Sequence, residues 1–186
     1  MEMKDLVQNG FDNVKRTLDR TLDGLTAEEL KWQPKSDANS IGLILFHMIR
    51  TEDSMVHRMQ GKPQIWETEK WYQKFTKTIE DGGAHYTAEQ VAAFVVPDVK
   101  DLLAYSETVR KNTFEYLKGL KPKDFDKKVN LPPPPASMAM PAGNTPPRRP
   151  PFEPIVGSML MHEVTELAGH AGEISYIRGL QRGMDK

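Results

Sequence analysis

The sequence predicts an all-α protein, an antiparallel four-helix bundle that forms a single domain over residues 1–186. Two observations lead to this prediction. Four segments of roughly 20 or more residues repeat apolar side chains every three or four positions, which is the period of an amphipathic helix. No segment alternates apolar and polar residues as a half-buried strand does. The length also fits one domain and is too small for two well-buried ones.

The first helix is predicted from an apolar stripe near the N-terminus, and Gly24 is a plausible stop for it. A short helical piece should follow at residues 26–30, where Thr26 and Glu29 have the spacing of a capping box. Pro34 and the polar residues after it then predict a loop. The stripe of the first helix consists of Val7, Phe11, Val14, Leu18, Leu22 and Leu25.

The second long helix should begin at Asn39 or Ser40 and end near Gln60, because Gly61 and Pro63 stop a helix. Residues 64–86 are aromatic and irregular, and we interpret them as a connection with one helical turn. A short helix at residues 88–95 should end before the proline at position 97. The apolar face of the second helix comprises Ile41, Ile44, Leu45, Met48, Met55 and Met59.

The third long helix should run over residues 98–117, with Asp98 as its cap and Gly119 as its terminator. Its buried stripe is predicted to contain Val99, Leu102, Ser106, Val109, Thr113 and Tyr116 or Leu117. The fourth should run over residues 153–180, with Gly183 beyond it. Its buried face is predicted to contain Leu160, Val164, Leu167, Ala171, Ile174 and Ile177.

A proline-rich insertion at residues 132–154 interrupts the helical pattern before the last helix. Prolines at this density exclude a helix or a central strand and favour extended polyproline II. One interpretation is a solvated connection; the others are a lid or a PxxP ligand for a partner domain. Met138, Met140 and Phe152 are apolar residues that a plain linker would not need. We therefore expect part of the segment to fold back over the mouth of the functional site.

Composition narrows the classes of function. The chain has 25 Lys and Arg against 26 Asp and Glu, a net charge of −1, which gives no support for non-specific nucleic-acid binding. It has no cysteine, which excludes a disulfide, a thiolate nucleophile and a thiolate-bound metal. The most apolar run, residues 41–48, is far shorter than the ~20 residues of a membrane span. With no secretory signal, the expected compartment is the cytoplasm.

Three titratable residues share one face of the fourth helix. His162, Glu166 and His170 are spaced four residues apart and border the apolar seam. A buried charge must be paired or metal-bound, so this placement indicates a site. The two histidines lie about 12 Å apart along the helix axis. An adjacent pair is therefore the natural chelate, and a third ligand should come from another helix.

His47, in the middle of the second helix, is the obvious supplier of that ligand. Two histidines and one carboxylate form the three-ligand set of catalytic zinc and of non-haem iron, with one position left open. The string His162-Glu-Val-Thr-Glu166 lacks the second histidine of the HExxH signature, which argues against a zincin peptidase. His57 and His85 are predicted to lie on the surface without a role.

Two motifs resemble the DinB-like (YfiT-like) superfamily of four-helix-bundle metalloproteins: Ser40-Ile-Gly-Leu-Ile-Leu-Phe-His47, and residues 166–179 with Glu166-Leu-Ala-Gly-His170. The resemblance implies that His47, Glu166 and His170 bind one divalent ion, for which we favour zinc or nickel over iron. Many members have histidine where this chain has Glu166. The Glu-x-x-x-His pair is similar to that of the mycothiol-dependent isomerase branch. The resemblance also implies a homodimer.

The activity implied by the resemblance is that of a metal-dependent enzyme that activates a small thiol or water. A thiol S-transferase or a hydrolase acting on a small-molecule substrate fits this chemistry. A thiol would have to arrive as a low-molecular-weight co-substrate, because the chain has no cysteine. His162 is a candidate catalytic proton carrier, and Arg50 and Arg178 are candidates for holding an anionic substrate.

Two alternatives remain open at this stage. The first is a metal- or ligand-binding module without catalysis, of a stress or regulatory kind. The second is a structural four-helix protein whose polar cluster is only hydrogen-bonded. Bound metal separates the second alternative from the others, and thiol-dependent turnover of an electrophile separates an enzyme from the module.

Overall fold

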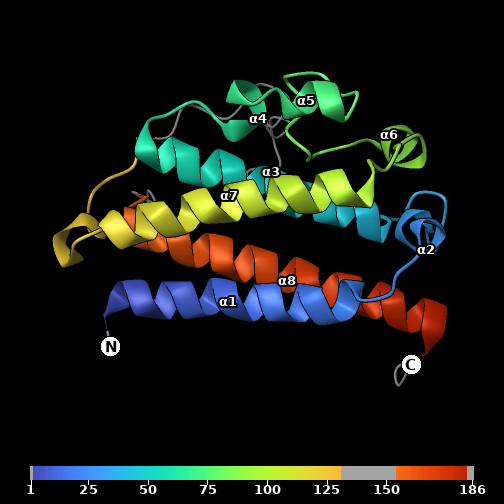
Figure 1. Cartoon of the computed structure of the whole chain (residues 1–186), viewed down its shortest axis with the longest axis horizontal. Helices are drawn as coiled ribbons and strands as arrows, with labels where there is room; N and C mark the ends of the chain where they lie inside the picture. The colour runs from blue at the N-terminus through green and yellow to red at the C-terminus, as the bar shows by residue number, and fades with distance from the viewer. Residues whose placement is uncertain (1, 131–153, 184–186) are drawn as a thin grey trace, which may run out of the picture.

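The computed structural model describes residues 2–130 and 154–183. Four long helices form the body of this part of the chain: α1 (Met3–Leu22), α3 (Ile41–Gln60), α7 (Val99–Gly119) and α8 (Val156–Arg182). α1 and α8 run in one direction, and α3 and α7 run in the other (Figure 1). The described residues contain no strand, only an isolated bridge, so the predicted all-α bundle is confirmed.

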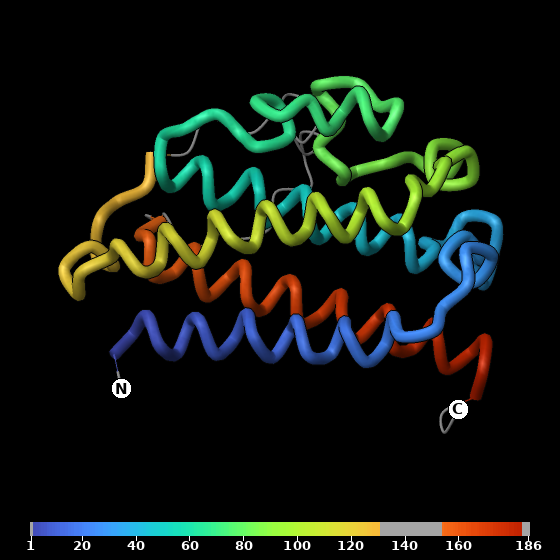
Figure 2. Tube along the Cα trace, viewed as in Figure 1, coloured from blue at the N-terminus to red at the C-terminus, as the bar shows by residue number. Residues whose placement is uncertain are grey.

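Short helices occupy the connections. α2 (Ala27–Lys31) joins α1 to α3, and η1 (Pro122–Asp124) follows α7. The long crossover from α3 to α7 contains α4 (Ile65–Thr68), α5 (Trp71–Lys74) and α6 (Ala88–Ala92). It returns the chain to the starting end of α3, so α3 and α7 run parallel while the two termini lie at opposite ends of the bundle (Figure 2).

Helix ends follow the local capping signals. The Ser40 side chain accepts a hydrogen bond from the backbone N–H of Leu43 at the start of α3, and Gly61 ends that helix in a left-handed conformation, φ 64°. Thr26 and Glu29 form the predicted capping box of α2, and Asp98 caps α7. These residues are the ones that the sequence singled out.

α8 begins three residues later than predicted. The backbone N–H of Val129 donates to Pro154 O at 2.7 Å, and the N–H of Val156 donates to Lys127 O at 2.9 Å. Residues 154 and 155 are therefore paired with the chain after η1 and cannot enter a helix. This pairing also places residues 127–129 beside the start of α8. The lid prediction itself falls on residues outside the described part of the chain.

Residues 64–86 contain two short helices rather than one helical turn. Their aromatic side chains pack on α3 and α7: Trp66 stacks at a tilt on Tyr105 with ring centroids 5.8 Å apart, and Phe75 meets Phe46 edge-on at 6.0 Å. Trp66 is fully buried. The crossover is thus a fixed layer over one side of the bundle (Figure 1), because its rings extend the core.

The predicted buried stripes are correct at most core positions, but several of their residues, such as Leu18, Met55 and Val99, are only half-buried. On α7 the buried residue is Tyr105, and Ser106 is only half-buried. On α8 Val164 is half-buried at the contact with α1, where a Cβ on Gly10 would lie 2.6 Å from its side chain. The residue that turns into the core there is Glu163. None of the described helices has the length and apolarity needed to cross a membrane.

Candidate metal centre

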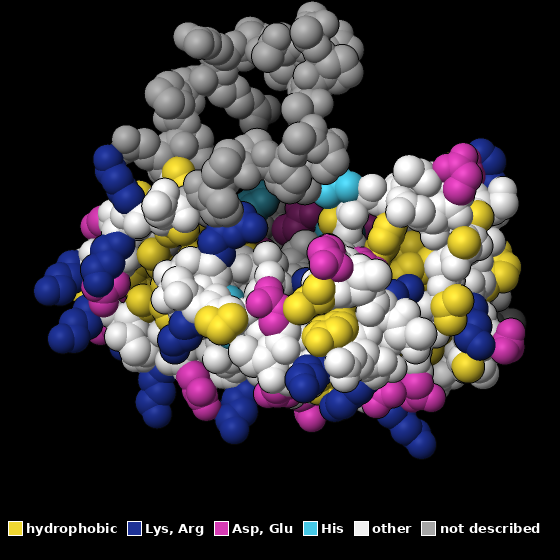
Figure 3. All heavy atoms as spheres, turned by 90° about the horizontal axis from the view of Figure 1, so that it is seen from above, with side chains coloured by type: hydrophobic (Ala, Val, Ile, Leu, Met, Phe, Trp, Pro, Cys, Tyr) yellow, Lys and Arg dark blue, Asp and Glu magenta, His cyan; other side chains and the backbone are white. Residues whose placement is uncertain are grey.

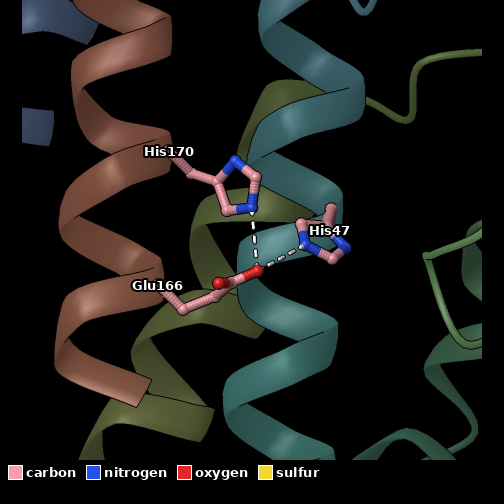
Figure 4. A group of neighbouring side chains, drawn as sticks. All are labelled: His47, Glu166 and His170. Carbon is pink, nitrogen blue, oxygen red and sulfur yellow. Dashed lines mark hydrogen bonds and ion pairs between the residues drawn. The ribbon is translucent and has the colours of Figure 1, made fainter. Parts of the chain in front are cut away.

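Three side chains converge between α3 and α8. His47 projects from the middle of α3, and Glu166 and His170 project from successive turns of α8 (Figure 4). Nε2 of His170 lies 3.2 Å from Oε1 of Glu166, and Nε2 of His47 lies 3.8 Å from the same oxygen. The two imidazole rings meet nearly at right angles, with centroids 4.7 Å apart. One potential ligand atom from each residue falls within 4.8 Å of the others.

These separations suit a single divalent ion. Ligand atoms at 2.0–2.1 Å from a tetrahedral zinc lie about 3.3 Å from one another. The distances of 3.2 and 3.8 Å to Glu166 are close to that value, so small side-chain rotations would bring all three atoms into bonding range. The donor set of two imidazoles and one carboxylate also leaves a fourth position open.

Each imidazole has an acceptor at its other nitrogen. Nδ1 of His47 lies 2.9 Å from Gly83 O, and Nδ1 of His170 lies 2.8 Å from Oε2 of Glu173. A carbonyl oxygen can only accept, so Nδ1 of His47 carries the proton in the neutral ring and its Nε2 keeps a lone pair. His170 has a carboxylate oxygen at hydrogen-bond distance from each ring nitrogen, Glu173 at Nδ1 and Glu166 at Nε2. An acceptor at Nδ1 is typical of metal-bound histidine. Burial, partly opposed by the Gly83 hydrogen bond, lowers the pKa of His47 and keeps it neutral.

A cavity of about 380 Å³ opens beside the three side chains. Histidine and acidic side chains lie together in a hollow on the face of the molecule that Figure 3 shows. One part of the wall is apolar and is formed by Leu43, Ile44, Ala84 and Val91. The polar part contains the three converging side chains, and it also includes Asn39, Thr51, Gly83, His85 and Tyr86. The volume is enough for a small molecule to approach the converging atoms.

Three residues proposed from sequence lie elsewhere. His162 is exposed on α8 and does not line the cavity. Arg50 cannot hold a substrate anion: it is 3% exposed, and its Nη1 donates to Tyr105 Oη at 2.9 Å and to the Asp53 carboxylate at 3.3 Å. Arg178 lines a separate cavity near the end of α1, away from the three side chains.

His57 is not a surface residue, contrary to the sequence prediction. It is 4% exposed, and its Nδ1 lies 2.8 Å from Oδ1 of Asp53. Although burial opposes it, the hydrogen bond with Asp53 raises the pKa of His57. Its polar neighbours in sequence suggested solvent, but Asp53 is itself buried as its partner. His85 is exposed as expected, yet it lines the cavity.

Sequence reasoning missed Glu163. Its side chain is 1% exposed in the core, one turn before Glu166, and its Oε1 has no hydrogen-bond partner among the described residues. Burial, together with the charges of Glu52 and Glu166, raises its pKa to about 8. Arg110 does not neutralise it, because that guanidinium donates to both oxygens of Glu52 at 2.8 and 2.7 Å. The available signal was its register: position 163 lies between the buried positions 160 and 167.

Residues 11–174 match the family model of the DinB superfamily. The chain belongs to the DinB superfamily. This DinB chain is also similar to a crystal structure described as the conserved protein of locus from Enterococcus faecalis. The TM-score is 0.76 with 20% identity over 97% of each chain, which shows a shared fold. No curated protein matches it. The resemblance carried by the motifs at positions 40–47 and 166–179 is thereby confirmed at the level of the superfamily.

Proposed function

We propose that this DinB protein is a metal-dependent enzyme in which His47, Glu166 and His170 bind one divalent ion. The observation that supports this most is the convergence of two imidazole Nε2 atoms and a carboxylate oxygen at the wall of a cavity. Both rings have their Nδ1 atoms occupied by acceptors, as metal-bound histidines do. Zinc or nickel is the ion we favour over iron.

A bound divalent ion with an open position would lower the pKa of a thiol or water and so supply a nucleophile at neutral pH. Residues of the chain would orient the ligands of the ion and shape the cavity beside it. Gly83 O and Glu173 fix the two rings, and Leu43, Ile44 and Val91 keep part of the cavity wall dry. The Glu-x-x-x-His pair is similar to that of the mycothiol-dependent isomerase branch. We therefore favour a thiol S-transferase with a low-molecular-weight thiol as co-substrate, and then a hydrolase.

Replacing His170 with alanine is expected to remove most of the bound metal, because it leaves only two of three ligands. Elemental analysis of the purified proteins after incubation with zinc and desalting measures this. His162→Ala is the matched control: it removes an exposed histidine of the same helix and should retain the wild-type metal content. Full metal content in His170→Ala would show that the ligand set is wrong.

Zinc affinity should fall steeply below about pH 6, since histidine ligands must be neutral to bind. The lowered pKa of His47 delays proton competition at that ring compared with an exposed histidine. Competition with a zinc-sensitive dye at a series of pH values between about 5 and 8 measures the dependence. An affinity that stays constant across this range would contradict ligation by two histidines.

Turnover separates an enzyme from a binding module. Zinc-loaded and metal-free protein are incubated with a small thiol and a soft electrophile, and loss of free thiol is followed. The proposed activity requires turnover that depends on both the ion and the thiol. Wild-type protein that binds zinc but accelerates neither thiol transfer nor hydrolysis would support the module instead.

A further inference from the structure

A loop at residues 81–86, named here the clamp loop, lies against α3 beside His47. Its Gly83 O is 2.9 Å from His47 Nδ1, and Arg50 Nε donates to Asp81 O at 3.2 Å. His47 and Arg50 are one turn apart on α3, so the loop is tied to two successive turns of that helix. Within the loop, Asp81 Oδ1 accepts hydrogen bonds from the Gly83 N–H at 2.9 Å and the Tyr86 hydroxyl at 2.5 Å.

Arg50 is a fixed anchor for this loop. Its guanidinium lies over the Trp66 ring at 4.3 Å, and Nη1 is held by Asp53 and Tyr105. Asp53 also accepts from the backbone N–H groups of Ile65 and Trp66, so α3, α4 and α7 all hold the guanidinium in place. An arginine with this many partners in the core has little freedom to move.

Gly83 is the position that requires glycine. Its φ is +71°, and a Cβ there would lie 2.9 Å from both Cβ and Cγ of Arg50. A Cβ on the neighbouring Gly82 would have no heavy atom of the described residues within 4 Å. The absence of a side chain at position 83 thus lets the backbone carbonyl approach His47 while the loop stays packed on Arg50.

We propose that the clamp loop positions the metal site, with Gly83 and Arg50 as its positioning residues. Gly83 O selects the Nδ1–H tautomer of His47 and thereby directs the Nε2 lone pair at Glu166 before an ion arrives. Arg50 keeps the carbonyl in place through Asp81. The link to metal affinity rests on the proposed function, whereas the tautomer is a property of the metal-free protein.

Gly83→Ala tests the proposal, with Gly82→Ala as the matched control. Long-range ¹⁵N–¹H spectra of the metal-free proteins report which imidazole nitrogen of His47 carries the proton. Wild type and Gly82→Ala should show Nδ1–H alone, and Gly83→Ala should show a mixture of tautomers. Zinc affinity should fall roughly 10- to 100-fold in Gly83→Ala and stay unchanged in Gly82→Ala.

Asp81→Ala provides a second test in case Gly83→Ala does not fold. It removes the acceptor of the Gly83 N–H without adding a side chain, and it should shift the tautomer and the affinity in the same direction. Retention of a pure Nδ1–H tautomer in the folded variants overturns the proposal, as does a mixed tautomer with wild-type zinc affinity. Failure of the proposed function looks different: wild type then binds no zinc, while its His47 spectrum still shows Nδ1–H.

Discussion

Replacing Asp53 with asparagine is expected to lower the free energy of unfolding by about 3–5 kcal/mol, because it leaves the Arg50 charge buried without its partner. Asp53 is fully buried and accepts from the Tyr105 hydroxyl at 2.5 Å and the Trp66 N–H at 2.8 Å. Its Oδ1 also accepts from the Ile65 N–H and pairs with His57. The amide keeps the shape of the side chain, so the change isolates the loss of charge and of acceptors.

Urea denaturation followed by circular dichroism measures this loss. Asp19→Asn is the matched control, because Asp19 is exposed and its ion pair with Lys15 is of the surface i,i+4 kind. The control should change stability by less than about 0.5 kcal/mol. A loss below about 1 kcal/mol in Asp53→Asn would show that the buried network does not depend on its charge.

Glu163→Gln is expected to stabilise the metal-free protein increasingly as pH rises. The folded-state pKa of Glu163 is raised from 4.5 to about 8 by burial and by neighbouring acidic charges. Below pH 4.5 both states hold the proton. Between the two pKa values the unfolded chain releases it and the folded chain keeps it, so wild type loses about 1.4 kcal/mol per pH unit through this group. Glutamine does not titrate and avoids that loss.

The groups that face Glu163 are Glu52 from α3, Arg110 from α7 and Glu166 from α8. The advantage of Glu163→Gln over wild type should therefore grow by up to about 4 kcal/mol between the two pKa values. Urea titrations at several pH values measure it, with the exposed Glu115→Gln on α7 as the control. Parallel stability profiles of wild type and Glu163→Gln would show that the carboxyl titrates normally in the core.

The helices were predictable because their signals are local. The apolar stripes, the Ser40 cap and the Gly61 terminator depend on residues within one or two turns of one another. The candidate site was predictable for a similar reason: Glu166 and His170 share a helix face by their spacing. Including His47 in the predicted site required one further assumption, that the middle of α3 faces the middle of α8. The two helices do pack against each other in the bundle.

The polar core was not predictable, because its partners are distant in sequence. His57 was predicted to lie on the surface and Arg50 to hold a substrate anion, yet Tyr105 of α7 and the crossover around Trp66 cover this side of α3. The contact between Gly83 and His47 joins positions 36 residues apart. Glu163 breaks the rule that core positions are apolar, so periodicity alone assigns the neighbouring Val164 to the core instead.

Anomalous diffraction at the zinc absorption edge, from crystals grown with zinc at neutral pH, tests the central claim most directly. The proposal predicts a peak between Nε2 of His47, a carboxylate oxygen of Glu166 and Nε2 of His170, at about 2.0–2.2 Å from each atom. His170→Ala crystals treated in the same way should lack this peak. Wild-type crystals with no peak at this position, or with zinc bound only by other residues, would contradict the account.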